Sequence, residues 1–206
     1  MKILSFDISS TTIGFAVLTV DKATKEKTLI SVDYLKPIKE GTILERLADT
    51  RNKVKKIIED VKPDHIAIEE IIMYLPKRSS ALTVITLAVF NRMSGLLALD
   101  YLGKGPQMFN VLAIRHGLKM TKKFPDKSDM PELVAKHLGI NFPYEYGKKG
   151  KSIVENEDKA DAIAVGLFAA YVLTGEKIIK DPPPKKKRVK KAKRVKKTLK
   201  LKKKVK

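Results

Sequence analysis

The sequence predicts an α/β domain built on a mixed five-stranded sheet that is flanked by helices. Three segments of strand length follow one another with short connections, at residues 3–8, 13–18 and 28–35, and strands connected in this way form an antiparallel meander. Two more strand-like segments, 64–70 and 108–112, each follow a long helical segment, so we expect them to be parallel strands of the same sheet.

The helices are predicted from apolar residues that recur every three or four positions. Pro63 marks the exit from the first helix, and Asn156 is a good N-cap for the last one. The predicted helices span residues 42–61, 81–102, a short segment from Ser128 or Asp129 to about Gly139, and 156–173.

The helix predicted over residues 81–102 is apolar on most of its sides. Asn91, Arg92 and Ser94 interrupt it, so it lacks the 18 uninterrupted apolar residues expected of a membrane span. A helix of this composition must be covered on most faces, either as the central core helix or as the seam of a dimer. Because a single sheet covers only one side of a helix, the dimer seam is a serious alternative.

Composition excludes several kinds of chemistry. The 206 residues are 43% hydrophobic, which is enough for one compact domain with a full core. There is no cysteine, so disulfides, thiolate metal sites and cysteine nucleophiles are excluded. The three histidines, at positions 65, 116 and 137, have no metal-ligand spacing. Any metal site must therefore be built mainly of oxygen ligands, which points to Mg²⁺ or Mn²⁺.

The formal net charge of +20 is concentrated at the C-terminal end. Residues 182–206 contain fifteen Lys or Arg and no acid, which leaves 28 basic and 23 acidic residues in the preceding 181. We therefore expect a folded domain over residues 1–178 and a disordered Pro/Lys-rich basic tail over 179–206. Such a tail binds polyanions by counterion release, and nucleic acid is the commonest polyanion inside cells.

A small set of acids stands at positions where a carboxylate is costly. Asp7 lies inside an otherwise apolar strand, where it must be paired, hydrogen-bonded or bound to a metal. The simpler alternative is that it only accepts hydrogen bonds from the Ser/Thr turn that follows. Glu69 and Glu70 end a later strand, and because strand side chains alternate, only one of them can face Asp7.

The last predicted helix carries two acids three residues apart, Asp158 and Asp161, which project from one face. The helix macrodipole explains an acid at Asp158, but Asp161 opens the apolar stripe of the helix and needs a partner. Four carboxylates without histidine or cysteine could hold two hard cations, which can activate water and stabilise the leaving oxygen of a phosphodiester. The basic tail independently indicates a polyanionic substrate.

These acid-bearing segments resemble the RuvC family of Holliday junction resolvases, within the RNase H-like nuclease superfamily. The resemblance covers roughly residues 1–173 and rests on three short motifs in order, 3–17 (ILSFDISSTTIGFAV), 67–70 (AIEE) and 158–164 (DKADAIA). It implies an RNase H-like fold and a Mg²⁺-dependent nuclease domain over residues 1–178. It also implies that Glu69 rather than Glu70 joins the metal site. The implied catalytic and metal-binding residues are Asp7, Glu69, Asp158 and Asp161, holding two Mg²⁺ ions for which Mn²⁺ can substitute.

The resemblance implies an endonuclease that works as a homodimer and cuts opposed strands of a four-way DNA junction. The family uses an aromatic residue shortly after the glutamate to help open the junction. Here that position holds Ile72, and the nearest aromatic is Tyr74. Implied DNA contacts, each with a solvated surface position as the alternative, are Tyr74, Lys77, Arg78, Arg115, Lys119, Lys122, Lys123 and Lys127.

Three other functions compete with this interpretation. The ATP-binding fold of actin and sugar kinases also places an acid and a Ser/Thr turn between two strands, but it needs a second domain and a second Gly-rich loop. A protein that binds branched DNA without cutting it would be hindered by four unneutralised acids. An RNase H-like nuclease that acts on structured RNA stays open. Tyrosines beside lysines in the loop at 141–153 also suit nucleic acid.

The expected location is intracellular. The apolar N-terminal start is short and interrupted by Asp7, so it is unlike a signal peptide. We expect the cytoplasm or nucleoid of a bacterial host, or the nucleus of a eukaryotic one, since residues 184–189 (PKKKRV) resemble a nuclear localisation signal. A nuclease of this kind with a basic extension suggests a phage or other viral origin.

Overall fold

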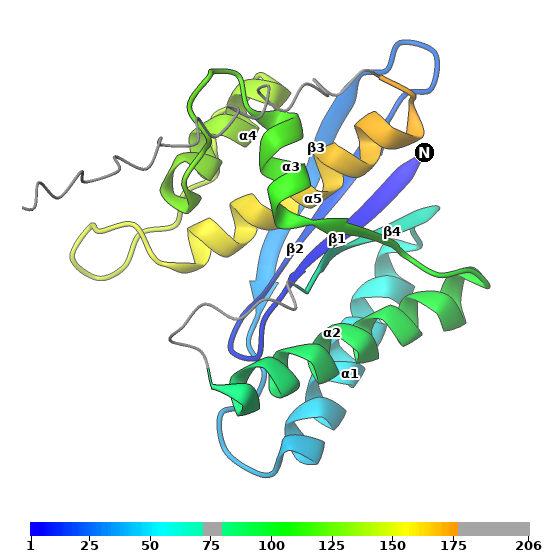
Figure 1. Ribbon diagram of the computed structural model, residues 1–206, viewed down its shortest axis with the longest axis vertical. Helices are drawn as coiled ribbons and strands as arrows, with labels where there is room; N and C mark the ends of the chain where they lie inside the picture. Colours follow the sequence, from blue (N-terminus) through cyan, green and yellow to red (C-terminus); the bar gives the residue numbers. More distant parts are fainter. Residues whose placement is uncertain (72–79, 177–206) are drawn as a thin grey trace, which may run out of the picture.

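The computed structural model describes residues 1–71 and 80–176, which form a five-stranded sheet with helices on both of its faces (Figure 1). The strands are β1 (Lys2–Ile8), β2 (Ile13–Val20), β3 (Lys27–Leu35), β4 (His65–Glu70) and β5 (Gln107–Asn110). The helices are α1 (Ile43–Val61), α2 (Ala81–Leu102), α3 (Val111–Leu118), the short 3₁₀ helix η1 (Lys127–Asp129), α4 (Met130–Leu138) and α5 (Glu155–Leu173).

The sheet is mixed, as the sequence predicts, and β1 lies at its centre. The strand order is β3-β2-β1-β4-β5. β1 and β3 both pair antiparallel with β2, which confirms the meander, while β4 pairs parallel with β1 and β5 parallel with β4. The parallel part places the carboxyl ends of β1 and β4 side by side, where functional groups of open sheets gather.

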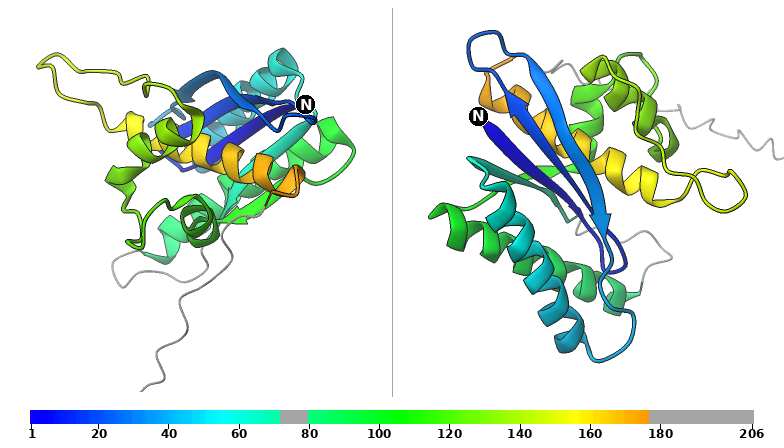
Figure 2. Two further views of the ribbon diagram at one scale, coloured as in Figure 1. Left: turned by 90° about the horizontal axis from the view of Figure 1, so that it is seen from above. Right: turned by 180° about the vertical axis from the view of Figure 1, so that it is seen from behind.

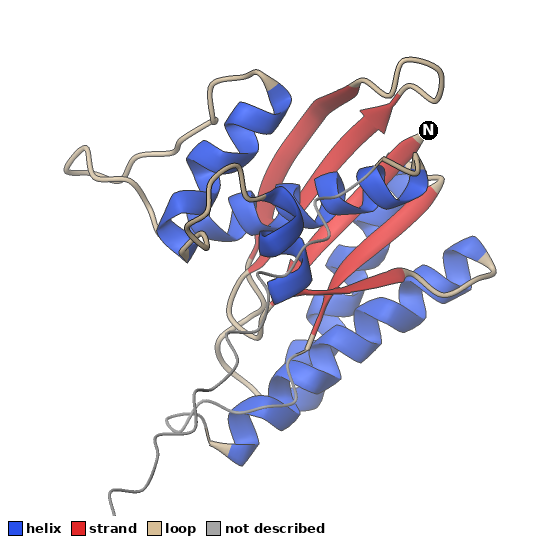
Figure 3. Ribbon diagram, turned by 45° about the horizontal axis from the view of Figure 1, so that its top comes forward, coloured by secondary structure: helices blue, strands red, loops and turns tan. Residues whose placement is uncertain are grey.

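The alternation of side chains along β1 separates two cores. Leu4, Phe6 and Ile8 face α1 and α2, and Ile3 faces the layer formed by α3, α4 and α5. Figure 2 shows these helices from above and from behind, and Figure 3 shows helices on both sides of the strands. Asp7 stands on the α5 face, so whatever its carboxylate contacts must come from that layer or from a neighbouring strand.

Helix α5 lies unusually close to the centre of the sheet. The Ser5 hydroxyl donates to the carbonyl oxygen of Ala162 at 2.7 Å, and a β-carbon at Gly166 would come within 2.7 Å of the same hydroxyl. Small side chains at these positions let the helix backbone approach the strands, and this fixes the height of the first turns of α5 above β1.

Two local predictions are wrong. The fifth strand ends at Asn110 instead of Leu112, because the Asn110 side chain accepts a hydrogen bond from the Leu112 backbone at 2.8 Å and caps α3. Asn156 is not an N-cap either, because α5 begins one residue before it, at Glu155. Its buried side chain instead bonds the backbone of the preceding loop. A propensity for caps cannot distinguish these two uses of asparagine.

Helix α2 uses only part of its surface, which packs against α1 and the sheet. The buried residues are Phe90, Asn91, Ser94, Leu97 and Ala98. Within the described part of the chain, α2 is the single helix that is long and apolar enough to cross a membrane by length and composition alone, a test that core helices also pass. Its opposite side remains apolar and exposed.

Candidate active site

The first pair of acids is brought together by the parallel pairing of β1 with β4. Ser5 pairs with Ala67 and Phe6 with Ile68, so Asp7 and Glu69 follow as the next neighbours, on the α5 face. Glu70 points to the opposite face, where its carboxylate binds the Arg92 guanidinium of α2 at 2.7 Å. The register therefore assigns Glu69, and not Glu70, to the surroundings of Asp7, which alternation alone could not decide.

The second pair of acids arrives on α5, and a glycine makes its approach possible. Gly14 is the cross-strand neighbour of Asp7. The backbone of Asp158 lies directly over Gly14, because a β-carbon there would come within 2.7 Å of the Asp158 carbonyl carbon and closer still to its oxygen. Asp161, one helical turn later, is buried. Carboxylates from β1, β4 and α5 thus meet above the centre of the sheet.

Two cations lie among these acids. The Lys127 ammonium, on η1, is 2.9 Å from Asp158 Oδ1 and 3.7 Å from Asp161 Oδ2. The Arg115 guanidinium, on α3, is 3.7 Å from Asp161 Oδ1. Within residues 1–71 and 80–176, no three acidic or histidine side chains converge closely enough to make a ready-made metal site. Lys127 supplies positive charge at the place where the acids approach each other.

Burial and neighbouring negative charges raise the pKa values of three of these acids. Burial raises the pKa of Asp7 well above its usual range, and the negative charges of Glu69 and Asp161 raise it further. Burial and the charge of Asp161 raise the pKa of Glu69 to about 7. Burial raises the pKa of Asp161 to about 6, although Lys127 and Arg115 act in the opposite direction. Lys127 has a raised pKa despite its partial burial, because of its hydrogen bond to Asp158.

This donor set suits a hard divalent cation. All of the candidate ligands in it are carboxylate oxygens, which Mg²⁺ and Mn²⁺ prefer. Desolvation and mutual repulsion disfavour the ionised acids, and a cation placed among them would remove both penalties. The residues present therefore fit the metal that the sequence implies.

The predicted DNA contacts are distributed over three environments. Tyr74, Lys77 and Arg78, together with Ile72, lie outside the described residues. Lys122 and Lys123 are exposed and Lys119 is half-buried, within 3.3 Å of His116. Arg115 and Lys127, in contrast, pair with acids of the cluster, Arg115 largely buried and Lys127 with its side chain partly exposed.

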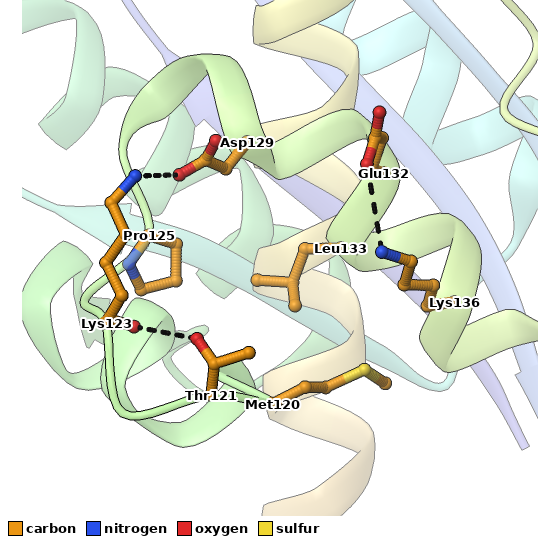
Figure 4. A pocket seen from close by; sticks show the side chains of 8 residues that line it. All are labelled: Met120, Thr121, Lys123, Pro125, Asp129, Glu132, Leu133 and Lys136. Atoms are coloured by element: carbon orange, nitrogen blue, oxygen red, sulfur yellow. Dashed lines mark hydrogen bonds and ion pairs between the residues drawn. The ribbon is translucent and has the colours of Figure 1, made fainter.

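A surface pocket lies beside the loop that carries Lys123 (Figure 4). The Lys123 ammonium is 3.5 Å from both Asp126 and Asp129, and Lys136 pairs with Glu132 at 3.7 Å. None of the four candidate acids lines this pocket. Its charges are already paired, so we do not assign the chemistry to it.

Sequence reasoning missed Gly14 as a contributor to the site, and it named Lys127 only as an implied DNA contact. A glycine inside a strand can mark a close backbone approach, so Gly14 did carry a readable signal. The position of Lys127 among the acids had no local signal, because it depends on how the loop between α3 and α4 folds over α5.

The comparisons with known proteins agree with this architecture. The family model for crossover junction endodeoxyribonuclease RuvC matches residues 3–115. No curated protein sequence matches significantly.

Among solved structures, Thermus thermophilus RuvC in complex with a Holliday junction substrate is similar with a TM-score of 0.63 at 18% identity. The match covers 85% of this chain and 97% of that one. Two other similar structures are the yeast mitochondrial Holliday junction resolvase Ydc2 (TM-score 0.58, 12% identity, 84% of this chain and 80% of that) and the Fowlpox virus resolvase with Holliday junction DNA (0.52, 12%, 82% and 99%).

At these identities the solved structures establish the fold, which is that of the RuvC-like resolvases. The family model goes further, because it matches more than half of the 206 residues and includes both Asp7 and Glu69. The chain therefore belongs to the family of the crossover junction endodeoxyribonuclease RuvC.

Proposed function

We propose that this protein is a metal-dependent endonuclease that cuts four-way DNA junctions. The observation that carries the proposal is the convergence of Asp7, Glu69 and Asp161 from three different elements. The charge of Asp161 raises the pKa values of both Asp7 and Glu69, and the charge of Glu69 raises that of Asp7. A fold gains no stability from such repulsion, so the cluster makes sense as a site for a cation and a phosphodiester.

Asp7, Glu69, Asp158 and Asp161 would hold Mg²⁺, and Mn²⁺ would substitute for it. When bound, such ions activate water for attack on a phosphodiester and stabilise the leaving oxygen. Asp7 occupies the central strand, where it faces both Glu69 and α5, and this position suits the role of a shared ligand. Asn91 supports Glu69 from behind, since its side-chain nitrogen donates to the Glu69 carbonyl oxygen at 2.8 Å.

Lys127 and Arg115 would serve the phosphate. Both carry positive charge at the edge of the acidic cluster, Lys127 against Asp158 and Arg115 against Asp161. A scissile phosphate that enters this site brings negative charge, and these side chains can turn from the acids to its oxygens. Lys127 is the better placed of the two, because its side chain is 43% exposed whereas that of Arg115 is 18% exposed.

Cutting opposed strands of one junction needs two active sites, and α2 offers a surface on which a second copy can dock. Its exposed apolar residues recur with alternating spacings of three and four, at Leu82, Ile85, Val89, Leu96 and Leu99. Arg92 occupies the remaining position of this series. Such a heptad stripe is typical of helices that pack against a copy of themselves. We therefore assign the homodimer interface to this face of α2.

The test is cleavage of a synthetic mobile four-way DNA junction, alongside a linear duplex of the same sequence, with Mg²⁺ present. Paired, symmetric nicks in the junction alone are expected. Indiscriminate cutting of both DNAs would keep the metal site and reject junction specificity. Binding without nicks would favour a branched-DNA binding protein, or a structured RNA as the substrate, which the same assay on a folded RNA would reveal.

A further inference from the structure

The segment before α5 forms a basic hairpin, residues 141–153, that projects from the N-terminal end of this helix (Figure 1). Tyr146 and Ser152 form an antiparallel bridge, and the Gly147 backbone donates to the Lys151 carbonyl oxygen at 2.8 Å. Gly150 closes the tip with a φ of +66°, a conformation that glycine adopts without strain. The segment is thus an ordered hairpin with a defined tip.

The tip of the hairpin exposes positive charge that has no partner in the described parts of the chain. Lys148, Lys149 and Lys151 are all exposed, and within residues 1–71 and 80–176 no carboxylate lies within 4.0 Å of their ammonium groups. The exposed lysines Lys56 and Lys136 differ, since each pairs with an acid one helical turn away.

An aromatic ladder leads from the core to this tip. The Phe142 ring is 8% exposed and meets the Tyr144 ring edge-on at 4.8 Å between centroids. Tyr144 in turn lies 6.2 Å from Tyr146, whose side chain is 64% exposed. A large ring held at the surface beside three lysines can stack on a base or sugar while the lysines contact phosphates.

The base of the hairpin is fastened to α5 by two buried polar residues. The Asn156 side chain accepts from the Glu145 backbone at 3.0 Å and donates to its carbonyl oxygen at 2.7 Å and to the Ser152 hydroxyl at 2.9 Å. Lys159 is 2% exposed, and its ammonium donates to the Pro143 carbonyl oxygen and to Glu145 Oε1, both at 3.0 Å. Burying an ammonium group costs free energy. A loop that served only as a solvent-exposed connection would gain nothing from such an anchor, so the anchor indicates that the position of the hairpin matters.

These anchors belong to the same helical turns as the candidate acids. Asn156 and Lys159 flank Asp158 in the sequence, so the orientation of the hairpin and the position of Asp158 are set by one rigid element. We propose that the hairpin 141–153 is a nucleic-acid-binding element that grips the DNA strand beside the cleaved phosphate. Lys148, Lys149 and Lys151 contact the sugar–phosphate backbone, and Tyr146 stacks on a base or sugar near the branch point. This inference rests on the proposed function for its choice of DNA.

The test measures the Kd for a labelled four-way junction by fluorescence anisotropy, as a function of salt. All proteins carry Asp7→Asn and the buffer contains EDTA, so that no cleavage is needed. The first variant is Lys148→Ala/Lys149→Ala/Lys151→Ala. Its matched control is Lys22→Ala/Lys55→Ala/Lys104→Ala, which removes the same charge from exposed positions outside the helical layer that carries the hairpin.

The hairpin variant is expected to bind about tenfold or more weakly than the control, and its slope of log affinity against log salt should be smaller in magnitude by about 2 to 3. Tyr146→Ala is expected to weaken binding about fivefold or more, and Tyr146→Phe should retain it because it keeps the ring. Equal affinities and slopes for the hairpin variant and the control would overturn the inference. If the triple lysine variant binds weakly but Tyr146→Ala binds normally, only the proposed stacking of Tyr146 is overturned.

The result is separable from the proposed function. If the protein that retains Asp7 cuts junctions while the hairpin and control variants bind alike, the nuclease stands and the hairpin inference fails. If the Asp7→Asn protein binds the junction through the hairpin but the protein that retains Asp7 does not cut it, the hairpin inference stands and the cleavage proposal fails. If neither protein binds the junction, both proposals fail.

Discussion

The carbonyl group of Asp158 lies directly over the α-carbon of Gly14, the residue that pairs with Asp7 across β1 and β2. This contact sets how closely the first turn of α5 approaches the centre of the sheet. A side chain at position 14 would therefore act on the geometry of the acidic cluster without touching any of its carboxylates.

Gly14→Ala is expected to lower the free energy of unfolding by about 1–3 kcal/mol, because the added methyl overlaps backbone atoms that cannot turn aside. It should also abolish most cleavage by displacing Asp158. Urea unfolding and the junction assay measure the two effects. Gly105→Ala is the control, since a β-carbon at Gly105 meets nothing within 4 Å, and both properties should stay unchanged there.

Asp7→Asn should abolish cleavage and yet stabilise the metal-free protein. The mutation removes a negative charge that faces Glu69 and Asp161, while junction binding remains largely intact. Thermal unfolding in EDTA should show a gain on the order of 1 kcal/mol. A loss of stability in EDTA would contradict the idea that repulsion among these acids costs folding energy.

The same repulsion predicts how stability changes with pH. The folded pKa values of Glu69 and Asp161, about 7 and about 6, exceed their ordinary values of 4.5 and 3.8. The folded protein therefore binds protons that the unfolded chain has released. Its free energy of unfolding in EDTA should fall as the pH rises from about 4 to about 8, and Mg²⁺ should restore part of it at pH 8. A metal-free stability that rises over this interval would reject this account.

Lys127 supplies positive charge that a bound cation would otherwise bring. Its removal should therefore lower the stability of the metal-free protein and raise the affinity for Mg²⁺. Lys127→Gln should destabilise the protein in EDTA, because Asp158 and Asp161 lose a partner. It should also raise the affinity for Mg²⁺, measured by calorimetry. Lys123→Gln is the control, because Lys123 pairs with Asp126 and Asp129 outside the cluster. Weaker Mg²⁺ binding by Lys127→Gln would contradict the prediction.

Much of the fold could be predicted because its signals are local. The short apolar segments at 3–8 and 13–18 and the helical spacing of 42–61 depend on neighbouring residues, and all three elements are confirmed. The mixed character of the sheet also followed, since short connections make a meander and long helical ones make parallel pairs, whereas the position of β4 beside β1 was not predicted. Family resemblance named Glu69 over Glu70 at the end of the fourth strand, and the parallel register with β1 places Glu69 on the same face as Asp7.

The remaining features depend on tertiary contacts. Asn156 has the composition of an N-cap, but the hairpin before it supplies better partners than the helix end does. Lys127 and Arg115 were named as DNA contacts, and the structure pairs their charges with the carboxylates of α5, a contact between distant segments that the sequence did not predict. The pattern of residues within a single segment cannot reveal such electrostatic contacts between segments that are distant in the sequence.

The basic tail is expected to add affinity without adding chemistry. If residues 182–206 engage about eight phosphates, the slope of log affinity against log salt should be near about −7. A protein that ends at residue 181 should show a flatter slope and still cut the junction. At low salt, residues 1–181 alone should bind the junction. If the shortened protein does not cut it there, the tail is required for activity.

The exposed apolar stripe on α2 predicts a dimer interface. Charged substitutions in this stripe should separate the two copies without unfolding either of them. Ile85 and Leu96 are 60% and 59% exposed, so Glu at these positions removes little from the core of one copy. Ile85→Glu/Leu96→Glu should therefore sediment as a monomer, retain its circular dichroism spectrum, and lose the paired nicking of opposed strands. Leu44→Glu is the matched control, because Leu44 is exposed and apolar but lies on α1. A double variant that still sediments as a dimer would move the interface to another face.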